Sequence, residues 1–208
     1  MKSSDVWSHI HAERAQMAET WKGLTPEQWA SPSWCVGWPV QEVAGHVVAA
    51  AEQTIPNFFK DMALVRFNFD AFADKDAKRN AAAGPGELIR RLEARTTTTN
   101  HPPAPVVAML GEIVVHGEDI RRPLGLTHEV AIAALVAVAD SWKSSNVLIG
   151  AKRRISGLSL RATDTQWSHG EGPEVSGPMV ALLLSMAGRK GAYLDLSGDG
   201  LALLASRP

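Results

Sequence analysis

The feature that most constrains this chain is a pair of polar side chains on one apolar face of a predicted helix. Glu112 and His116 are four residues apart, so on a helix they lie one turn apart on the same face. Met109 and Ile120 continue this stripe on either side and mark it as a face for burial. A buried carboxylate is costly unless a metal, a cation or strong hydrogen bonds compensate its charge. The short pattern alone also fits a Glu–His hydrogen bond inside a helical bundle.

Size and charge exclude several classes of protein. The 208 residues are 45% apolar, enough for one domain or for one domain plus a small second one. The net charge of -1 offers no electrostatic attraction to nucleic acid or to an anionic membrane, so we expect neither partner. Cys35 is the one cysteine, which rules out a disulfide within the chain. The N-terminus lacks the apolar core of a signal peptide, and the longest apolar run, 130–139, is too short to span a bilayer. We therefore expect a cytoplasmic protein.

Apolar spacing predicts an antiparallel helical bundle in the first part of the chain. Between two of its helices, residues 61–86 are poorly periodic and carry several cations, which fits either a mobile flap or a solvated charged surface. The predicted helices are 3–23, 39–56, 85–95, 104–122 and 128–148.

The apolar period changes after Gly150. Residues 158–163 alternate as a strand does, and 166–169 can pair with them. A helix follows Gly177-Pro178, and the alternation returns at 192–196. The sequence therefore predicts a mainly α protein with two domains, a helical bundle over 1–150 and a small α+β domain over 155–208.

A histidine on a second helix completes a possible metal site. His46 flanks the apolar line of helix 39–56; taken alone, it fits a core histidine. In an antiparallel bundle, however, His46, Glu112 and His116 make a set of two imidazoles and one carboxylate. Three protein ligands leave open positions for water or substrate, as in catalytic zinc sites, and the same set suits Fe(II). The pattern is not that of the zinc proteases, because Gly117 and not Glu follows His116.

Two motifs carry a family resemblance. W-C-x-G-W-x-V-x-x-V-x-x-H at 34–46 and E-x-x-x-H-G-x-D-I-R-x-P-L-G at 112–125 resemble the mycothiol-dependent maleylpyruvate isomerase family. That family belongs to the DinB-like four-helix bundle superfamily. Residues 177–200 resemble its second domain, a small fold akin to sterol-carrier proteins. The resemblance covers nearly the whole chain and implies this two-domain architecture.

The resemblance also implies functions for particular residues. His46, Glu112 and His116 are expected to bind a divalent metal, usually zinc. Arg189 is expected to be a catalytic residue that faces the site from the second domain and binds an anionic substrate. The alternative for Arg189 is a cation at a helix C-terminus beside Gly188, favoured by the helix dipole.

Two further residues of the motifs are open to interpretation. Asp119 follows His116 by three residues and either orients its imidazole or only bonds the adjacent loop. Cys35 lies between Trp34 and Trp38, and we interpret it as a packing residue because the sequence shows no nearby cation that would lower the pKa of its thiol.

The resemblance implies an enzyme that activates mycothiol. A free thiol titrates at about 8.5, and binding to a dication deprotonates it. With two His and one Glu a zinc site carries +1, so one thiolate brings it to neutrality. The expected reaction is isomerisation of, or S-transfer to, a small carboxylated electrophile, by a monomer or homodimer. The rivals are a non-catalytic metal-dependent binding protein or sensor, and an Fe(II)-dependent oxygenase on the same residues.

Overall fold

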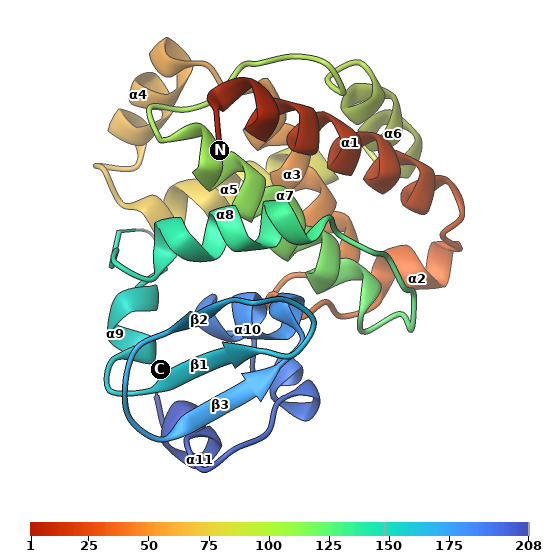
Figure 1. The fold of residues 1–208 in the computed structure, drawn as a ribbon. Helices are drawn as coiled ribbons and strands as arrows, with labels where there is room; N and C mark the ends of the chain where they lie inside the picture. The colour runs from red at the N-terminus through yellow and green to blue at the C-terminus, as the bar shows by residue number, and fades with distance from the viewer. Residues whose placement is uncertain (148, 208) are drawn as a thin grey trace. The chain divides into compact units, whose positions relative to one another are not determined.

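The computed structural model describes residues 1–147 and 149–207; Leu148, where the fifth predicted helix ends, and Pro208 lie outside them. The chain divides into two compact units, Met1–His128 and Glu129–Pro208 (Figure 1). The first is helical, and the second combines helices with a three-stranded sheet. This confirms the predicted fold class. None of the helices that the structure describes combines the length and apolar content needed to cross a membrane.

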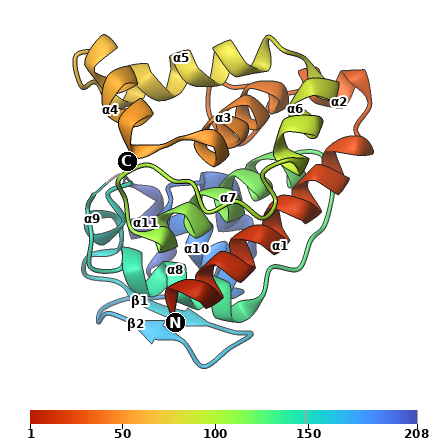
Figure 2. The same ribbon diagram turned by 90° about the horizontal axis from the view of Figure 1, so that it is seen from above.

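The first unit is built around a helical bundle. Helix α1 packs on α6 and α7, and α3 packs on the same two helices (Figure 2). Its core contains the apolar stripes expected from the sequence, with Ile10, Trp21, Val43, Leu88 and Leu110 fully buried. The helices of this unit are α1 (Ser3–Lys22), α2 (Pro26–Ala30), α3 (Val40–Glu52), α4 (Ile55–Leu64), α5 (Phe69–Ala81), α6 (Pro85–Glu93) and α7 (Val106–Arg121).

Residues 61–86 are more ordered than the sequence predicts. Most of them lie in α4 and α5, and α5 lies along α3 (Figure 2). The cations of this segment, Arg66, Lys75, Lys78 and Arg79, are exposed, so the expectation of a solvated charged surface is correct for them. The expectation of a mobile flap is wrong for α5, which the sequence did not predict because the helix has no apolar stripe. Its buried residues are small or polar: Asp76, Ala77, Asn80 and Ala81.

A close backbone contact explains how α5 packs without such a stripe. A Cβ at Gly45 of α3 would lie 2.5 Å from the carbonyl oxygen of Ala77 and 2.7 Å from the amide nitrogen of Ala81. Real Cβ atoms do not approach backbone atoms this closely, so only glycine permits the contact. Gly45 directly precedes His46, and the packing of α5 therefore helps to place a predicted site residue.

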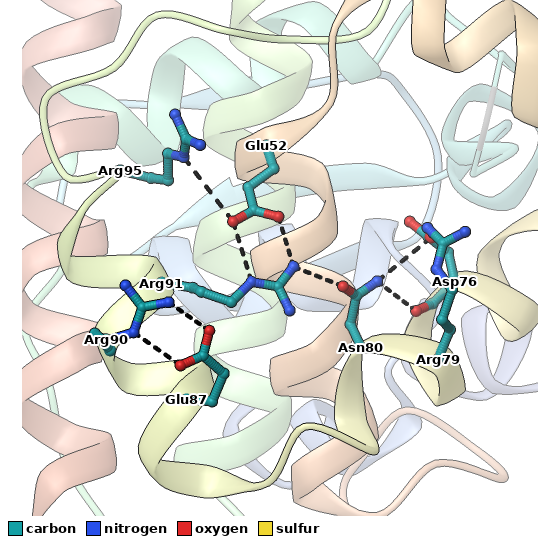
Figure 3. Close-up of polar contacts among 8 residues, drawn as sticks. All are labelled: Glu52, Asp76, Arg79, Asn80, Glu87, Arg90, Arg91 and Arg95. Atoms are coloured by element: carbon teal, nitrogen blue, oxygen red, sulfur yellow. Dashed lines mark hydrogen bonds and ion pairs between the residues drawn. The ribbon is translucent and has the colours of Figure 1, made fainter.

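A polar network joins α3, α5 and α6 at the C-terminal end of α3 (Figure 3). Arg91 of α6 donates to Glu52 of α3 through Nε at 3.1 Å and Nη2 at 2.5 Å, and Nη2 also donates to Oδ1 of Asn80 at 2.6 Å. Asn80 in turn donates to the carbonyl oxygen of Asp76 at 2.7 Å. Burial raises the pKa of the Asp76 carboxyl, and the neighbouring Arg79 offsets part of this rise. The network holds α5 and α6 against α3 by charge-assisted hydrogen bonds.

The second unit has a small mixed sheet of order β2-β1-β3. Strand β1 pairs antiparallel with β2 (Leu160 opposite His169) and parallel with β3 (Leu160 opposite Val175). Helix α10 packs on β1, on β3 and on α8. The elements are α8 (Ile132–Trp142), α9 (Ala151–Ile155), β1 (Ser159–Ala162), β2 (Ser168–His169), β3 (Glu174–Gly177), α10 (Met179–Met186), a 3-10 helix (Lys190–Asp195) and α11 (Leu201–Ala205).

Two details of this unit differ from the sequence expectations. The compact units divide between residues 128 and 129, ahead of the expected boundary at 150, because α8 packs on α10. The strand predicted at 192–196 is wrong, since a 3-10 helix occupies most of it. In a strand the side chains of residues 192, 194 and 196 would all lie on one face of the sheet. Here Ala192 and Leu196 are buried but Leu194 is 92% exposed, so the three apolar residues do not form one buried face.

The contact at Gly45 generates a stability prediction. We expect Gly45→Ala to lower the free energy of unfolding by about 1–3 kcal/mol, because α5 must move away from α3 to admit the methyl group. Urea unfolding followed by circular dichroism measures this loss. The control is Gly86→Ala in α6, where a Cβ meets nothing within 4 Å. It should be neutral or stabilise by up to about 1 kcal/mol. Equal stability of the two variants would contradict the packing argument.

Candidate metal centre

The structure brings the three predicted metal-binding residues together within the first unit. His46 comes from α3, whereas Glu112 and His116 come from successive turns of α7. Nε2 of His46 lies 3.5 Å from Oε1 of Glu112. The imidazole centroids of His46 and His116 are 5.0 Å apart, with the rings nearly perpendicular at 81°. The three side chains are only 12–25% exposed, so they lie in a largely desolvated place. Among the residues that the structure describes, however, the group of three whose ligand atoms lie within 4.8 Å of one another is Cys35, His116 and Asp119.

A buried carboxylate orients the ring of His116. Nδ1 of His116 lies 2.9 Å from Oδ2 of Asp119, and Asp119 is fully buried. A carboxylate only accepts hydrogen bonds, so Nδ1 carries the proton and Nε2 keeps its lone pair. The carbonyl oxygen of Asp119 also accepts the N–H of Trp34 at 3.0 Å. Asp119 therefore does both things that the sequence left open: it orients the imidazole and it bonds the adjacent loop.

A cation from α1 faces the carboxylate of Glu112. Burial raises the pKa of Glu112, and the neighbouring His116 and Arg14 offset part of this rise. Burial lowers the pKa of Arg14 to about 10, and the negative charge of Glu112 offsets part of this fall. The two side chains line a cavity of about 10 Å³, which holds about one water molecule. Arg14 therefore compensates part of the charge of the Glu112 carboxylate.

Arg14 is held in place by the chain around it. Its Nη1 donates to the carbonyl oxygens of Arg95 at 3.0 Å and Thr98 at 2.9 Å, and its guanidinium lies 5.8 Å from the centroid of the Trp7 ring. The apolar spacing along the chain gives no expectation for Arg14. The available signal was the charged pair Glu13-Arg14, both buried, at the point where the apolar stripe of α1 is interrupted.

An indole supports His46 from the other side. The Trp38 ring lies 5.2 Å from the imidazole of His46. Its Nε1 donates to Oδ1 of Asp74, on α5, at 3.2 Å. Helix α5 thus helps to position Trp38, and Trp38 contacts a predicted metal ligand.

Cys35 lies beside the same site. Its Sγ, a ring nitrogen of His116 and a carboxylate oxygen of Asp119 all lie within 4.8 Å of one another. The thiol is half-buried rather than enclosed in the core. The interpretation of Cys35 as a packing residue therefore overlooked its neighbours, because its sequence flanks, Trp34 and Trp38, say nothing about the distant α7.

One pair of the predicted ligand atoms has the spacing of two donors on a divalent cation. Histidine nitrogens and carboxylate oxygens bind zinc at about 2.0–2.2 Å, so two ligand atoms on one tetrahedral ion lie about 3.4 Å apart. The observed 3.5 Å between His46 and Glu112 agrees with this spacing. The imidazole of His116 is also fixed by a carboxylate, as ligating histidines usually are.

Arg189 belongs to the second unit. It lies just before the 3-10 helix and shortly after the end of α10, and its Nη1 donates to the carbonyl oxygen of Ala187 at 3.1 Å. This contact is the one expected of a cation at a helix C-terminus. The predicted function of Arg189 towards a substrate stays a prediction.

Comparison with known proteins gives one family and one fold. Residues 10–104 match the model described as the mycothiol maleylpyruvate isomerase N-terminal domain. The solved structures with a similar fold include the mycothiol-dependent maleylpyruvate isomerase and a mutant of it. Each has a TM-score of 0.67 and 12% identity, over 96% of this chain and 93% of that chain. At this identity the likeness shows a shared fold. A search of curated proteins finds no match.

The pairing of Arg14 with Glu112 predicts a stability loss. Arg14→Met should lower the free energy of unfolding by about 3 kcal/mol, because it leaves two carbonyl groups and a desolvated carboxylate without their cation. The same measurement on Arg90→Met, which removes an exposed guanidinium from α6, should show no change beyond error. If both variants match the wild type, Arg14 does not compensate Glu112.

Proposed function

Because this chain belongs to the mycothiol maleylpyruvate isomerase family through its N-terminal domain, residues 10–104, we propose that it is a metal-dependent enzyme that activates mycothiol. The observation that carries the proposal is the convergence of His46, Glu112 and His116 from two helices. The proposed reaction is isomerisation of, or S-transfer to, a small electrophile. The expectation of an enzyme agrees with this family.

The three converging residues would hold a divalent cation. Bound there, the cation would supply the positive charge that keeps a thiol deprotonated near neutral pH, whereas a free thiol titrates at about 8.5. Glu112 brings one negative charge and the neutral imidazoles of His46 and His116 bring none. A dication bound by these three ligands would therefore keep a net charge of +1, which a single thiolate would neutralise.

Residues around this set prepare it for binding. Asp119 keeps the proton of His116 on Nδ1, so that Nε2 is the nitrogen that can ligate. Trp38 lies against the ring of His46 and restricts its rotation. Arg14 lies on the α1 side of Glu112 and moderates the cost of its charge when no ion is bound. These contacts hold the ligating atoms in place before binding, which lowers the entropy lost on binding.

We further propose that Arg189 binds a carboxylate of the electrophile. The support is the resemblance of Ala187-Gly188-Arg189 to the second domain of the family, together with the partial exposure of the side chain. A guanidinium binds a carboxylate through two parallel hydrogen bonds, which also orients it. The substrate class is therefore a small carboxylated electrophile.

The metal prediction is tested by elemental analysis. Protein purified without chelator should carry about one zinc or similar divalent ion per chain, the number that a single three-ligand site holds. His46→Ala and His116→Ala should lose it, because two ligands bind more weakly than three. The control, His9→Ala on α1, should retain it. A wild type that neither takes up a divalent ion nor consumes mycothiol with any electrophile would overturn the proposal and favour a binding protein or sensor.

The substrate prediction is tested by kinetics. Arg189→Ala should keep the metal and the affinity for mycothiol, but kcat/KM for carboxylated electrophiles should fall by about one to two decades. This follows from the loss of one charged hydrogen bond, about 1.5–3 kcal/mol. Uncharged electrophiles of the same shape are the control and should be used equally well by both proteins. If carboxylated substrates are unaffected, Arg189 acts only at the end of α10.

A further inference from the structure

The phenylalanines of this chain are gathered in one segment. All five lie between residues 58 and 72, in α4, in the turn that follows it and at the start of α5. The structure describes all five, and none of them is buried. Phenylalanine is ordinarily among the residue types most often found in a core. The packing of the first unit therefore does not explain why this segment is so rich in phenylalanine.

Contacts between rings connect four of these phenylalanines. Phe58 lies against Phe59 and Phe72, with ring centroids 5.7 Å apart in each pair. Phe72 in turn lies 6.1 Å from Phe69. Helix α4 packs on α5 and buries only Met62 of its own residues (Figure 2). The segment thus leaves an apolar patch in solvent. The patch consists of five side chains that are 44–67% exposed: Ile55, Phe59, Leu64, Phe67 and Phe69.

An ordered turn presents the patch. The N–H of Phe67 donates to the carbonyl oxygen of Met62 at 2.8 Å, and Oδ1 of Asn68 accepts the N–H of Ala71 at 3.0 Å. Between these bonds Arg66 and Phe67 have φ angles of 54° and 59°. This left-handed conformation costs a residue with a side chain about 1–2 kcal/mol. Backbone strain of this kind is concentrated at functional positions, and here it accompanies an exposed aromatic ring.

The patch has the size of a protein interface. Large side chains present about 150–250 Å² each when fully exposed, so at the observed exposures the patch amounts to on the order of 500 Å² of apolar surface. Apolar patches of more than a few hundred Å² mark interaction sites. A typical interface buries about 800 Å² on each partner, of which about 55–65% is apolar. The patch supplies this apolar share.

The charges around the patch favour a second copy of the chain as the partner. Residues 55–72 are electrically neutral, because their two cations balance their two anions: Lys60, Arg66, Asp61 and Asp70. An anionic membrane binds helices with an excess of Lys and Arg, and this segment has none. A two-fold axis brings identical surfaces together, so the cations of one copy can meet the anions of the other. The segment is therefore complementary to itself.

We propose that the apolar patch joins two copies of this chain in a symmetric dimer whose two-fold axis passes near the middle of α4. Phe59 lies at the middle of this helix, so the Phe59 rings of the two copies face each other across the axis. In such an interface each substitution occurs twice, and its cost in binding free energy is doubled. The proposal is independent of the metal centre and of the proposed reaction.

Sedimentation velocity over a wide range of protein concentration tests the proposal. The wild type should be a dimer, and Phe59→Glu should be a monomer at the same concentrations. Loss of one interface anchor weakens binding by about tenfold or more, so two losses should raise the Kd by about two decades or more. The control is Leu194→Glu in the second unit, which places the same charge on a side chain that is 92% exposed. It should dimerise like the wild type. If circular dichroism shows that Phe59→Glu does not fold, Phe67→Glu takes its place.

Mixing two charged variants tests the position of the axis. Phe59→Lys alone should also be a monomer, because like charges meet across the axis, but an equimolar mixture of Phe59→Lys and Phe59→Glu should dimerise. A mixture that stays monomeric would overturn the proposal, as would a wild type that is monomeric throughout or a Phe59→Glu variant that dimerises normally. If a monomeric wild type binds neutral phosphatidylcholine vesicles and Phe59→Glu does not, the patch contacts a lipid surface instead of a second copy.

Discussion

The structure of the first unit depends on how the carboxylate of Glu112 is accommodated in an apolar stripe. An ionised carboxylate without a partner in such a place costs far more than a single helix can recover from its packing. The protein meets it with an imidazole on each side, His46 from α3 and His116 from α7, and with a guanidinium from α1. These partners come from α1, α3 and α7. The need to accommodate the Glu112 carboxylate therefore constrains how these three helices are positioned relative to one another.

The contact of α1 with α7 brings opposite charges of the two helices near each other at two places. Arg14 faces Glu112, and Glu13 lies 3.9 Å from Nη2 of Arg121. Arg121 folds back along α7 against Gly117, where a Cβ would lie 2.4 Å from Nη2 and would require the guanidinium to shift. Gly117, the glycine after His116, thus leaves the space that this guanidinium occupies. It makes room for the charge that pairs with α1.

The contacts of α3 hold the other half of the site. Its glycine, Gly45, admits α5 to van der Waals contact, and α5 supplies the carboxylate that holds Trp38 against His46. The loop that precedes α3 is bonded to Asp119, the same residue that orients His116. A change at any of these positions is therefore transmitted to the atoms that would hold the ion.

The sequence by itself determined what depends on local periodicity: the helix that carries Glu112 and His116 on one face, the strand β1 and the helix after Pro178. It also indicated His46 as their partner, through motifs rather than spacing. Only the tertiary structure placed Arg14 and Cys35 beside them and showed α5 packed on α3. These features arise from contacts between distant segments, made by charges, a thiol and small residues. Such side chains have no apolar repeat, so they leave no periodic signal in the sequence.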